Sequence, residues 1–185
     1  MSQEWVPTAV RVLREGGVIA YPTEHCFGLG CDPNCVDAVQ RILTIKQRRA
    51  EQGLILIGLD EHQLSSYANF AKLTEAERER VLSSWPGPNT WLIPCHPDVS
   101  PMVRGSHDTI AVRATAFVPC RQLLQAFANP VISTSANRHG QPAMLTANDV
   151  QTELGAELDY VVDLPVGGAS QPSTIRDARS GTQLR

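Results

Sequence analysis

Short runs of apolar, often β-branched residues alternate along this chain with stretches whose apolar residues recur every three or four positions. The first pattern is typical of strands and the second of amphipathic helices. Residues 54–57 form an apolar run without polar alternation, which indicates a strand buried on both faces. Strands alternating with helices of this length predict an α/β domain with a twisted, largely parallel or mixed sheet flanked by helices.

The same patterns predict the order of the elements. We expect helices at residues 9–13, 36–43, 74–85 and 119–127, and one that opens at 146–149. We expect strands at residues 18–21, 54–57, 90–94, 109–113, 131–132, 160–162 and 173–175. Thr74 with Glu77, and Thr146 with Asp149, have the spacing of capping boxes at helix starts.

The length of 185 residues predicts a single domain over residues 1–185, because domains commonly have about 100–200 residues. The sequence has no uncharged apolar run of about 18 residues, which argues against a membrane-spanning helix. Charged residues interrupt the first 17 positions, so these lack the apolar core of a signal peptide and predict a cytoplasmic protein. A net charge of -3 disfavours non-specific attraction to polyanions, and any nucleic-acid surface should be local.

The five cysteines are scattered and odd in number, as expected of reduced thiols. Cys31 and Cys35 have a spacing that could begin a zinc site. The other nearby candidates in sequence are His25 and the adjacent pair Cys95 and His96, whereas zinc sites usually present a second, properly spaced pair. We therefore expect the cysteines to be structural and expect no protein-bound metal.

Polar clusters follow several predicted strands, where open α/β sheets bind their ligands. They occupy residues 22–25, 113–115, 133–137 and 173–176. Ser, Thr and Asn are also ordinary turn formers, so a purely structural role is an alternative for the third cluster. Arg113 follows a strand that should be buried, and it therefore needs an anionic partner. Protein carboxylate and ligand both remain open for that partner.

Three cations, Lys46, Arg48 and Arg49, stand at the predicted end of the second helix. Together they could neutralise a multiply charged anion. The helix macrodipole alone would also favour them, at about 0.3–1 kcal/mol each. The chain lacks the phosphate-binding loop G-x-x-x-x-G-K-[ST], the dinucleotide motif G-x-G-x-x-G and the hydrolase motif G-x-S-x-G. Any nucleotide must therefore be held by other means.

Read together, these clusters resemble the YrdC/TsaC (RimN) family in its short form. Members are threonylcarbamoyl-AMP synthases, which begin the formation of threonylcarbamoyladenosine in tRNA. The likeness covers nearly the whole chain. The matching segments, in order, are residues 21–24, 27–32, 46–48, 85–88 with Thr90, 111–113, 133–137, and 172–175 with Asp177. The K-x-R and S-x-N pair is the family's hallmark tetrad.

The resemblance implies a single YrdC-like domain around a concave, cationic cavity. It also implies a nucleotidyltransferase that joins L-threonine, bicarbonate and ATP into threonylcarbamoyladenylate and releases pyrophosphate. Carried over residue by residue, the catalytic cations are Lys46 and Arg48. The implied ATP and adenylate ligands are Lys46, Arg48, Ser133, Ser135, Asn137 and Ser173. The implied ligands of threonine and the carbamate are Thr23, Thr90 and Arg113.

The implied partners and cofactor follow from the same likeness. Mg²⁺ would arrive with ATP and bridge its phosphates with few protein ligands. Downstream tRNA-modification proteins would take the adenylate. Attack of a carbamate oxygen on the α-phosphate brings two anions together, so fixed cations should be a main catalytic resource. No general base can be named from the sequence.

Four residues depart from the family's pattern. Arg49 and Gly53 stand where the family often has Pro and Asn-Pro, and His25 and Phe27 replace a frequent Thr and Tyr. The competing function is a binding module of the same fold for double-stranded RNA or a ribosomal RNA precursor. The net charge of -3 and the absence of interleaved aromatic residues weigh against it. A related carbamoyl-transfer or sugar-phosphate enzyme is a third alternative.

Overall fold

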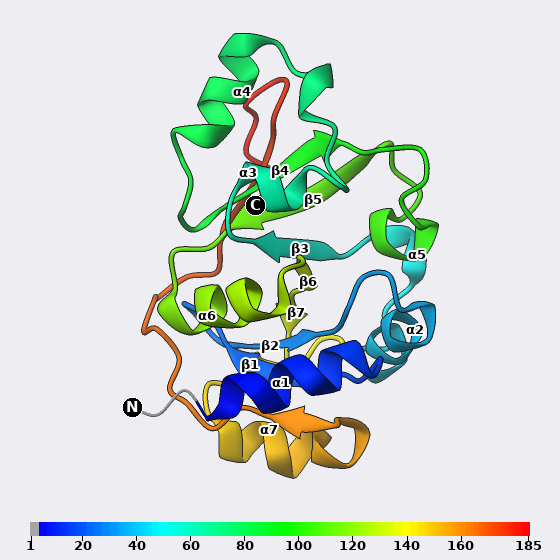
Figure 1. The fold of residues 1–185 in the computed structure, drawn as a ribbon, viewed down its shortest axis with the longest axis vertical. Helices are drawn as coiled ribbons and strands as arrows, with labels where there is room; N and C mark the ends of the chain where they lie inside the picture. The colour runs from blue at the N-terminus through cyan, green and yellow to red at the C-terminus, as the bar shows by residue number, and fades with distance from the viewer. Residues whose placement is uncertain (1–3) are drawn as a thin grey trace.

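The computed structural model describes residues 4–185, and Figure 1 shows their arrangement. Residues 1–3 of the predicted domain lie outside this part. The helices are α1 (Trp5–Arg14), α2 (Val36–Ile45), α3 (Glu61–Leu64), α4 (Glu75–Leu82), α5 (Pro101–Arg104), α6 (Val118–Phe127) and α7 (Ala147–Leu154). Short 3-10 turns lie at Ala50–Gln52, Phe70–Lys72 and Gly155–Glu157.

The strands of the described part form two sheets. They are β1 (Ile19–Pro22), β2 (Phe27–Gly30), β3 (Ile55–Gly58), β4 (Asn89–Pro94), β5 (Thr109–Ala114), β6 (Val131–Ile132), β7 (Thr134–Ser135), β8 (Tyr160–Val161) and β9 (Thr174–Asp177). The first sheet has the order β7-β2-β1-β8 and the second β6-β3-β5-β4-β9. The predicted α/β class with mixed strands is confirmed, and the strands are divided between two sheets instead of one.

One short segment joins the two sheets. β6 pairs with β3 in the second sheet, and β7 pairs with β2 in the first. Ser133 lies between β6 and β7, and its backbone N–H donates to the carbonyl of Ile55. In Figure 1 this segment passes from the upper sheet to the lower one. Residues 133–137, which the sequence singled out, therefore begin where the two sheets meet.

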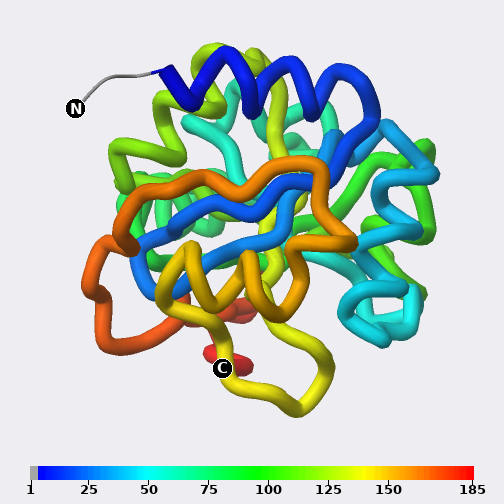
Figure 2. Tube along the Cα trace, turned by 90° about the horizontal axis from the view of Figure 1, so that it is seen from below, coloured from blue at the N-terminus to red at the C-terminus, as the bar shows by residue number. Residues whose placement is uncertain are grey.

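Helices cover both sheets. α1 packs against α6, and Figure 1 shows the two lying side by side across the molecule. β8 runs parallel to β1, and Figure 2 shows the segment after β8, in orange, continuing beside the first sheet before it turns away toward the C-terminus. This return path brings residues near 170 close to the turn that follows β1, because the N–H of Ala169 donates to the carbonyl of Glu24.

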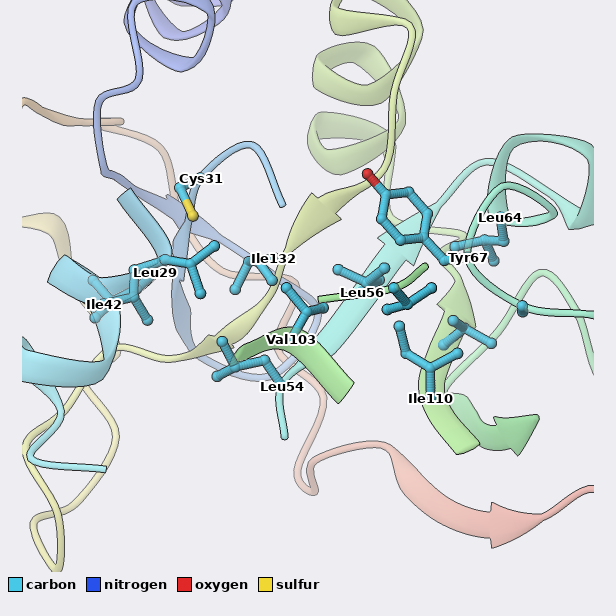
Figure 3. Close-up of a cluster of buried hydrophobic side chains, with 14 of the residues drawn as sticks. Leu29, Cys31, Ile42, Leu54, Leu56, Leu64, Tyr67, Val103, Ile110 and Ile132 are labelled. Atoms are coloured by element: carbon cyan, nitrogen blue, oxygen red, sulfur yellow. The ribbon is translucent and has the colours of Figure 1, made fainter. Parts of the chain in front are cut away.

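The core is continuous between the sheets. Leu29 of β2, Ile42 of α2, Leu56 of β3 and Ile132 of β6 belong to one buried cluster, which Figure 3 shows in close-up. Burial of apolar surface is the main favourable term in folding, at about 25 cal/mol per Å². A shared core of this kind fixes the two sheets relative to each other, and with them the residues at their junction.

Several predicted boundaries need correction. α2 ends at Ile45, so Lys46 caps it while Arg48 and Arg49 lie beyond it; the macrodipole alternative does not apply to those two arginines. α4 ends at Leu82, short of the predicted residue 85. The capping box at Thr74 is confirmed. At Thr146 the side chain caps the helix, but the Asp149 carboxylate accepts from the Thr146 hydroxyl.

Candidate functional site

A cavity of about 470 Å³ lies where the two sheets meet. Its walls come from the turn after β1, the start of β3, one face of β5, the link between β6 and β7, and the segment before β9. The lining residues with charged or hydroxyl side chains are Thr23, Glu24, Arg48, Arg104, Thr109, Arg113, Ser133, Thr134, Ser135, Ser173 and Arg185. The lining therefore contains four arginines and the carboxylate of Glu24, which pairs with Arg113.

Strand β5 sets the length of this cavity. Thr109, Ala111 and Arg113 alternate along the strand and all three line it, because side chains two apart share one face of a strand. A rise of about 3.3 Å per residue separates Thr109 from Arg113 by about 13 Å. Arg113 therefore lies on the side of the cavity near the turn after β1, where it contacts Glu24, and Thr109 lies farther from that turn along the strand.

Arg113 has a protein carboxylate as its partner. Its Nη1 donates to Oε1 of Glu24 at 2.6 Å, and the Thr115 hydroxyl donates to the same oxygen at 2.7 Å. Burial would raise the pKa of Glu24, but the Arg113 guanidinium and these hydrogen bonds hold the pKa below its ordinary value. Glu24 thus stays ionised and fixes a buried guanidinium at the cavity wall, so a ligand is not required to explain Arg113.

Two residues predicted to bind the substrate threonine, Thr23 and Thr90, differ in whether they line the cavity. Thr23 lines the cavity and donates to the carbonyl of Cys26 at 2.7 Å, which closes the turn after β1. Thr90 is fully buried behind the lining, and its hydroxyl is hydrogen-bonded to that of Ser173 at 2.9 Å. Ser173 itself lines the cavity. The structure thus places Thr90 behind Ser173, one layer from the cavity.

Lys46 of the K-x-R motif contacts both residues of the S-x-N motif. The Lys46 ammonium donates to the carbonyl of Ser135, and to the carbonyl and Oδ1 of Asn137 at 3.1 and 2.9 Å. The Ser135 hydroxyl donates to the same Oδ1 at 2.7 Å. Lys46 is buried, and it does not line the cavity. Its three donors hold the segment after β7 in place.

Arg48 is the member of the tetrad whose charge faces the cavity. Burial, and then the nearby charge of Arg185, lower the pKa of Arg48. Its Nε is buried with no hydrogen-bond partner among the described residues. Two guanidinium groups that repel each other, one with an unused donor, form a site suited to an anion with several charged oxygens. Arg49 points elsewhere, with a side chain that is 81% exposed.

Sequence reasoning missed two lining arginines, Arg185 and Arg104. Arg185 is held by an antiparallel backbone contact with Ile175, and its Nη2 donates to the carbonyl of Ser173 at 3.1 Å. Arg104 reaches the lining from α5, which carries no motif. Glu24 and His25 belong to the predicted polar cluster at residues 22–25, although neither was assigned a role there.

In residues 4–185, no three His, Cys, Asp or Glu side chains gather where they could hold a metal ion. No helix of that part is both long and apolar enough to cross a membrane. Four cysteines are buried, and Cys35 is half-buried. Cys26 lines the cavity, so at least one thiol lies at the candidate site.

Several known proteins are similar to this chain in sequence and in fold. The chain is 47% identical over 180 residues to a threonylcarbamoyl-AMP synthase from Nitrosococcus oceani, covering 97% of this chain and 96% of the relative. It is 44% identical to the protein of the same name from Stenotrophomonas maltophilia, covering 100% of both. A structure titled as P. abyssi Sua5 complexed with L-threonine matches with a TM-score of 0.87 and 30% identity, covering 96% of this chain.

The likeness extends to longer proteins. Another P. abyssi Sua5 structure superimposes with a TM-score of 0.92 and 28% identity over 100% of this chain. This chain spans 57% of that protein and 52% of the threonine complex, so both have further parts. The family profile described as "Sua5_yciO_yrdC: Telomere recombination" matches residues 11–185. The chain belongs to the Sua5/YciO/YrdC family.

Proposed function

We propose that this protein is a threonylcarbamoyl-AMP synthase, which forms L-threonylcarbamoyladenylate and pyrophosphate from L-threonine, bicarbonate and ATP. Relatives with this name align over the whole chain. The single observation that carries the proposal is the cavity at the junction of the sheets, where Arg48, Arg113 and Arg185 stand among serine and threonine hydroxyls. The cavity of about 470 Å³ lies in the usual range for small-molecule sites.

The amino-acid end of the cavity is assigned to the neighbourhood of Arg113. The guanidinium of Arg113 would hold the carboxylate of threonine, and its ion pair with Glu24 keeps it in position. Thr23 lines the same end. Ser173, with Thr90 behind it, also lines the cavity, and its carbonyl accepts from Arg185, so Ser173 is assigned to the nucleotide. The P. abyssi relative has been solved with L-threonine, which supports an amino-acid site in this fold.

The nucleotide end is assigned to Arg48, Arg185 and the segment that begins at Ser133. Arg48 and Arg185 would neutralise the phosphates, with hydroxyls from Ser133 and Ser135 beside them. Lys46 would act by holding Ser135 and Asn137. This gives Lys46 a positioning role and leaves the direct phosphate contacts to the arginines.

This arrangement suits the reaction physically. A carbamate oxygen must attack the α-phosphate while pyrophosphate leaves, and both reactants are anions. Fixed guanidinium groups offset the repulsion without having to reorganise during the step. Holding the amino acid and the nucleotide at neighbouring positions in one cavity supplies the remaining advantage, because the attack becomes effectively unimolecular.

Mg²⁺ is proposed to accompany ATP. The described residues offer no cluster of three or more ligating side chains, and this donor set fits an ion carried by the nucleotide. Mg²⁺ prefers phosphate oxygens and water, with one or two carboxylates at most. Bound in this way, the ion would neutralise charge on the phosphates. We also propose that residues 1–185 act as one domain, and that tRNA-modification proteins receive the adenylate.

Pyrophosphate release with substrates omitted one at a time tests the function. We expect release only when ATP, Mg²⁺, L-threonine and bicarbonate are all present. Release without threonine would indicate simple ATP hydrolysis and contradict the proposal. Tight binding of double-stranded RNA, without pyrophosphate release under full conditions, would favour the binding module.

A further inference from the structure

His25 has a defined tautomer at the amino-acid end of the cavity. Its Nδ1 lies 2.8 Å from the carbonyl oxygen of Ala169. A carbonyl oxygen only accepts hydrogen bonds, so Nδ1 carries the proton and donates it. In the neutral ring the lone pair is then on Nε2, and no described residue donates to that atom. The segment after β8 therefore orients a proton acceptor in the cavity lining.

The position of His25 places it beside the proposed amino-acid site. It follows Glu24, whose carboxylate binds Arg113. The other histidine in the lining, His107, precedes the start of β5, at the end of the cavity farthest from Arg113. Five residues lie between His107 and Arg113, and four of them belong to the extended strand β5. Of the two imidazoles, His25 is thus the one near a bound amino acid.

The other titratable groups in the lining are poor proton acceptors. The arginines stay protonated in proteins. Glu24 is committed to Arg113 and Thr115, and its pKa is held low. Burial raises the pKa of the Cys26 thiol, so the thiolate is disfavoured. Imidazole is also the side chain best suited to exchanging protons near neutral pH.

The proposed reaction needs a threonine amine that has lost a proton, and in this chain an imidazole stands at the amino-acid end, where the family often has Thr. Free threonine carries an ammonium group, which has no lone pair with which to form a bond to carbon. We propose that His25 is the general base that removes a proton from the threonine ammonium. This inference rests on the proposed function and deepens it by assigning the proton transfer.

The step balances as follows. The ammonium gives one proton to Nε2 of His25 and becomes an amine. The amine lone pair forms a C–N bond with the carbon of bicarbonate, and the hydroxyl of bicarbonate leaves with a second amine proton as water. The products are the N-carboxylate of threonine, water and protonated His25. His25 is only half-buried, so it can return its proton to solvent at the cavity mouth.

The test separates proton removal from adenylate chemistry. His25→Gln keeps a side chain of similar reach but has no basic nitrogen. Forward synthesis needs the proton transfer, whereas the reverse reaction of threonylcarbamoyladenylate with pyrophosphate to give ATP does not. We expect the variant to lower the forward kcat by about 10²-fold, as for loss of a general base. The reverse rate, the KM for threonine and the melting temperature should stay near wild type.

Two further variants sharpen the result. His25→Ala should regain forward activity when imidazole is added, and the matched control His62→Gln, at an exposed histidine of α3 outside the cavity lining, should retain forward activity without it. Equal loss in both directions, unchanged forward activity, or no rescue by imidazole would overturn the role of His25. Failure of the wild-type protein in both directions would instead overturn the proposed function.

Discussion

Replacing Lys46 with methionine should destabilise the protein markedly, because the ammonium is a structural tie. Its Nζ donates to two backbone carbonyls and to Oδ1 of Asn137, and the side chain is buried. Methionine fills a similar volume but donates nothing. One buried acceptor left without a partner costs about 1–3 kcal/mol. Ser135 and Asn137 are half-buried and can partly turn to water, so we expect about 3 kcal/mol for the whole loss.

That free energy is measurable as a thermal shift. For a protein of 150–250 residues, 1 kcal/mol moves the melting temperature by about 2–4 °C, so Lys46→Met should melt about 6–12 °C below wild type. Scanning calorimetry on the free protein is the assay. The matched control is Arg49→Met, which removes an exposed cation with a loose 3.8 Å ion pair and should leave the melting temperature nearly unchanged. Equal melting temperatures for both variants and wild type would refute this role for Lys46.

The same residue predicts a pH effect of definite sign. Burial, and then the charge of Arg48, lower the pKa of Lys46 to about 8 from 10.5. The unfolded chain therefore holds this proton more tightly between these two values, and the stability of wild type should rise as pH increases from about 8 to 10.5. Lys46→Met lacks this contribution, so the difference in free energy of unfolding between the two proteins should widen over that range. A narrowing would contradict the lowered pKa.

Three further substitutions test other parts of the site. Arg48→Ala should reduce adenylate formation by about 10²–10³-fold at saturating substrates with little change in melting temperature, whereas Arg49→Ala should retain most activity. Glu24→Gln leaves a buried guanidinium without its carboxylate and should lower the free energy of unfolding by about 3 kcal/mol, measured by calorimetry. This loss relative to wild type should be complete above pH 4.5 and should shrink as pH falls through the lowered pKa of Glu24. Gly53→Ala places a Cβ 2.9 Å from a carbonyl oxygen at a φ of 67°, and should destabilise more than Gly140→Ala, which has φ 77° and open space.

The sequence predicted those elements whose pattern was strong. The apolar run at residues 54–57 and the capping box at Thr74 correspond closely to β3 and α4. β2 was missed because Gly28 and Gly30 interrupt its apolar residues, so no run is visible. Those glycines allow close packing in the sheet, since a Cβ at Gly30 would lie 2.9 Å from the carbonyl of Ile132. Tertiary contact, which a local pattern does not record, decides this strand.

Only those parts of the candidate site that local sequence patterns mark were predictable. Polar clusters after strands led to Thr23, Arg113 and Ser133, which the structure brings to one cavity. Arg185 could not be found in this way, because it follows no predicted strand and is placed at the cavity by backbone pairing with Ile175 of β9. The direction of the Lys46 side chain could not be predicted either. The K-x-R pattern does not say whether the ammonium contacts a ligand or the segment after β7.

The identity of the product tests the central claim most directly. The protein would be incubated with ATP, Mg²⁺, L-threonine and ¹³C-bicarbonate, and the nucleotide products analysed by mass spectrometry. The proposed function predicts an adenylate that contains threonine and carries the ¹³C label, formed together with pyrophosphate. An adenylate of threonine without the label, or no adenylate at all beside intact ATP, would contradict it.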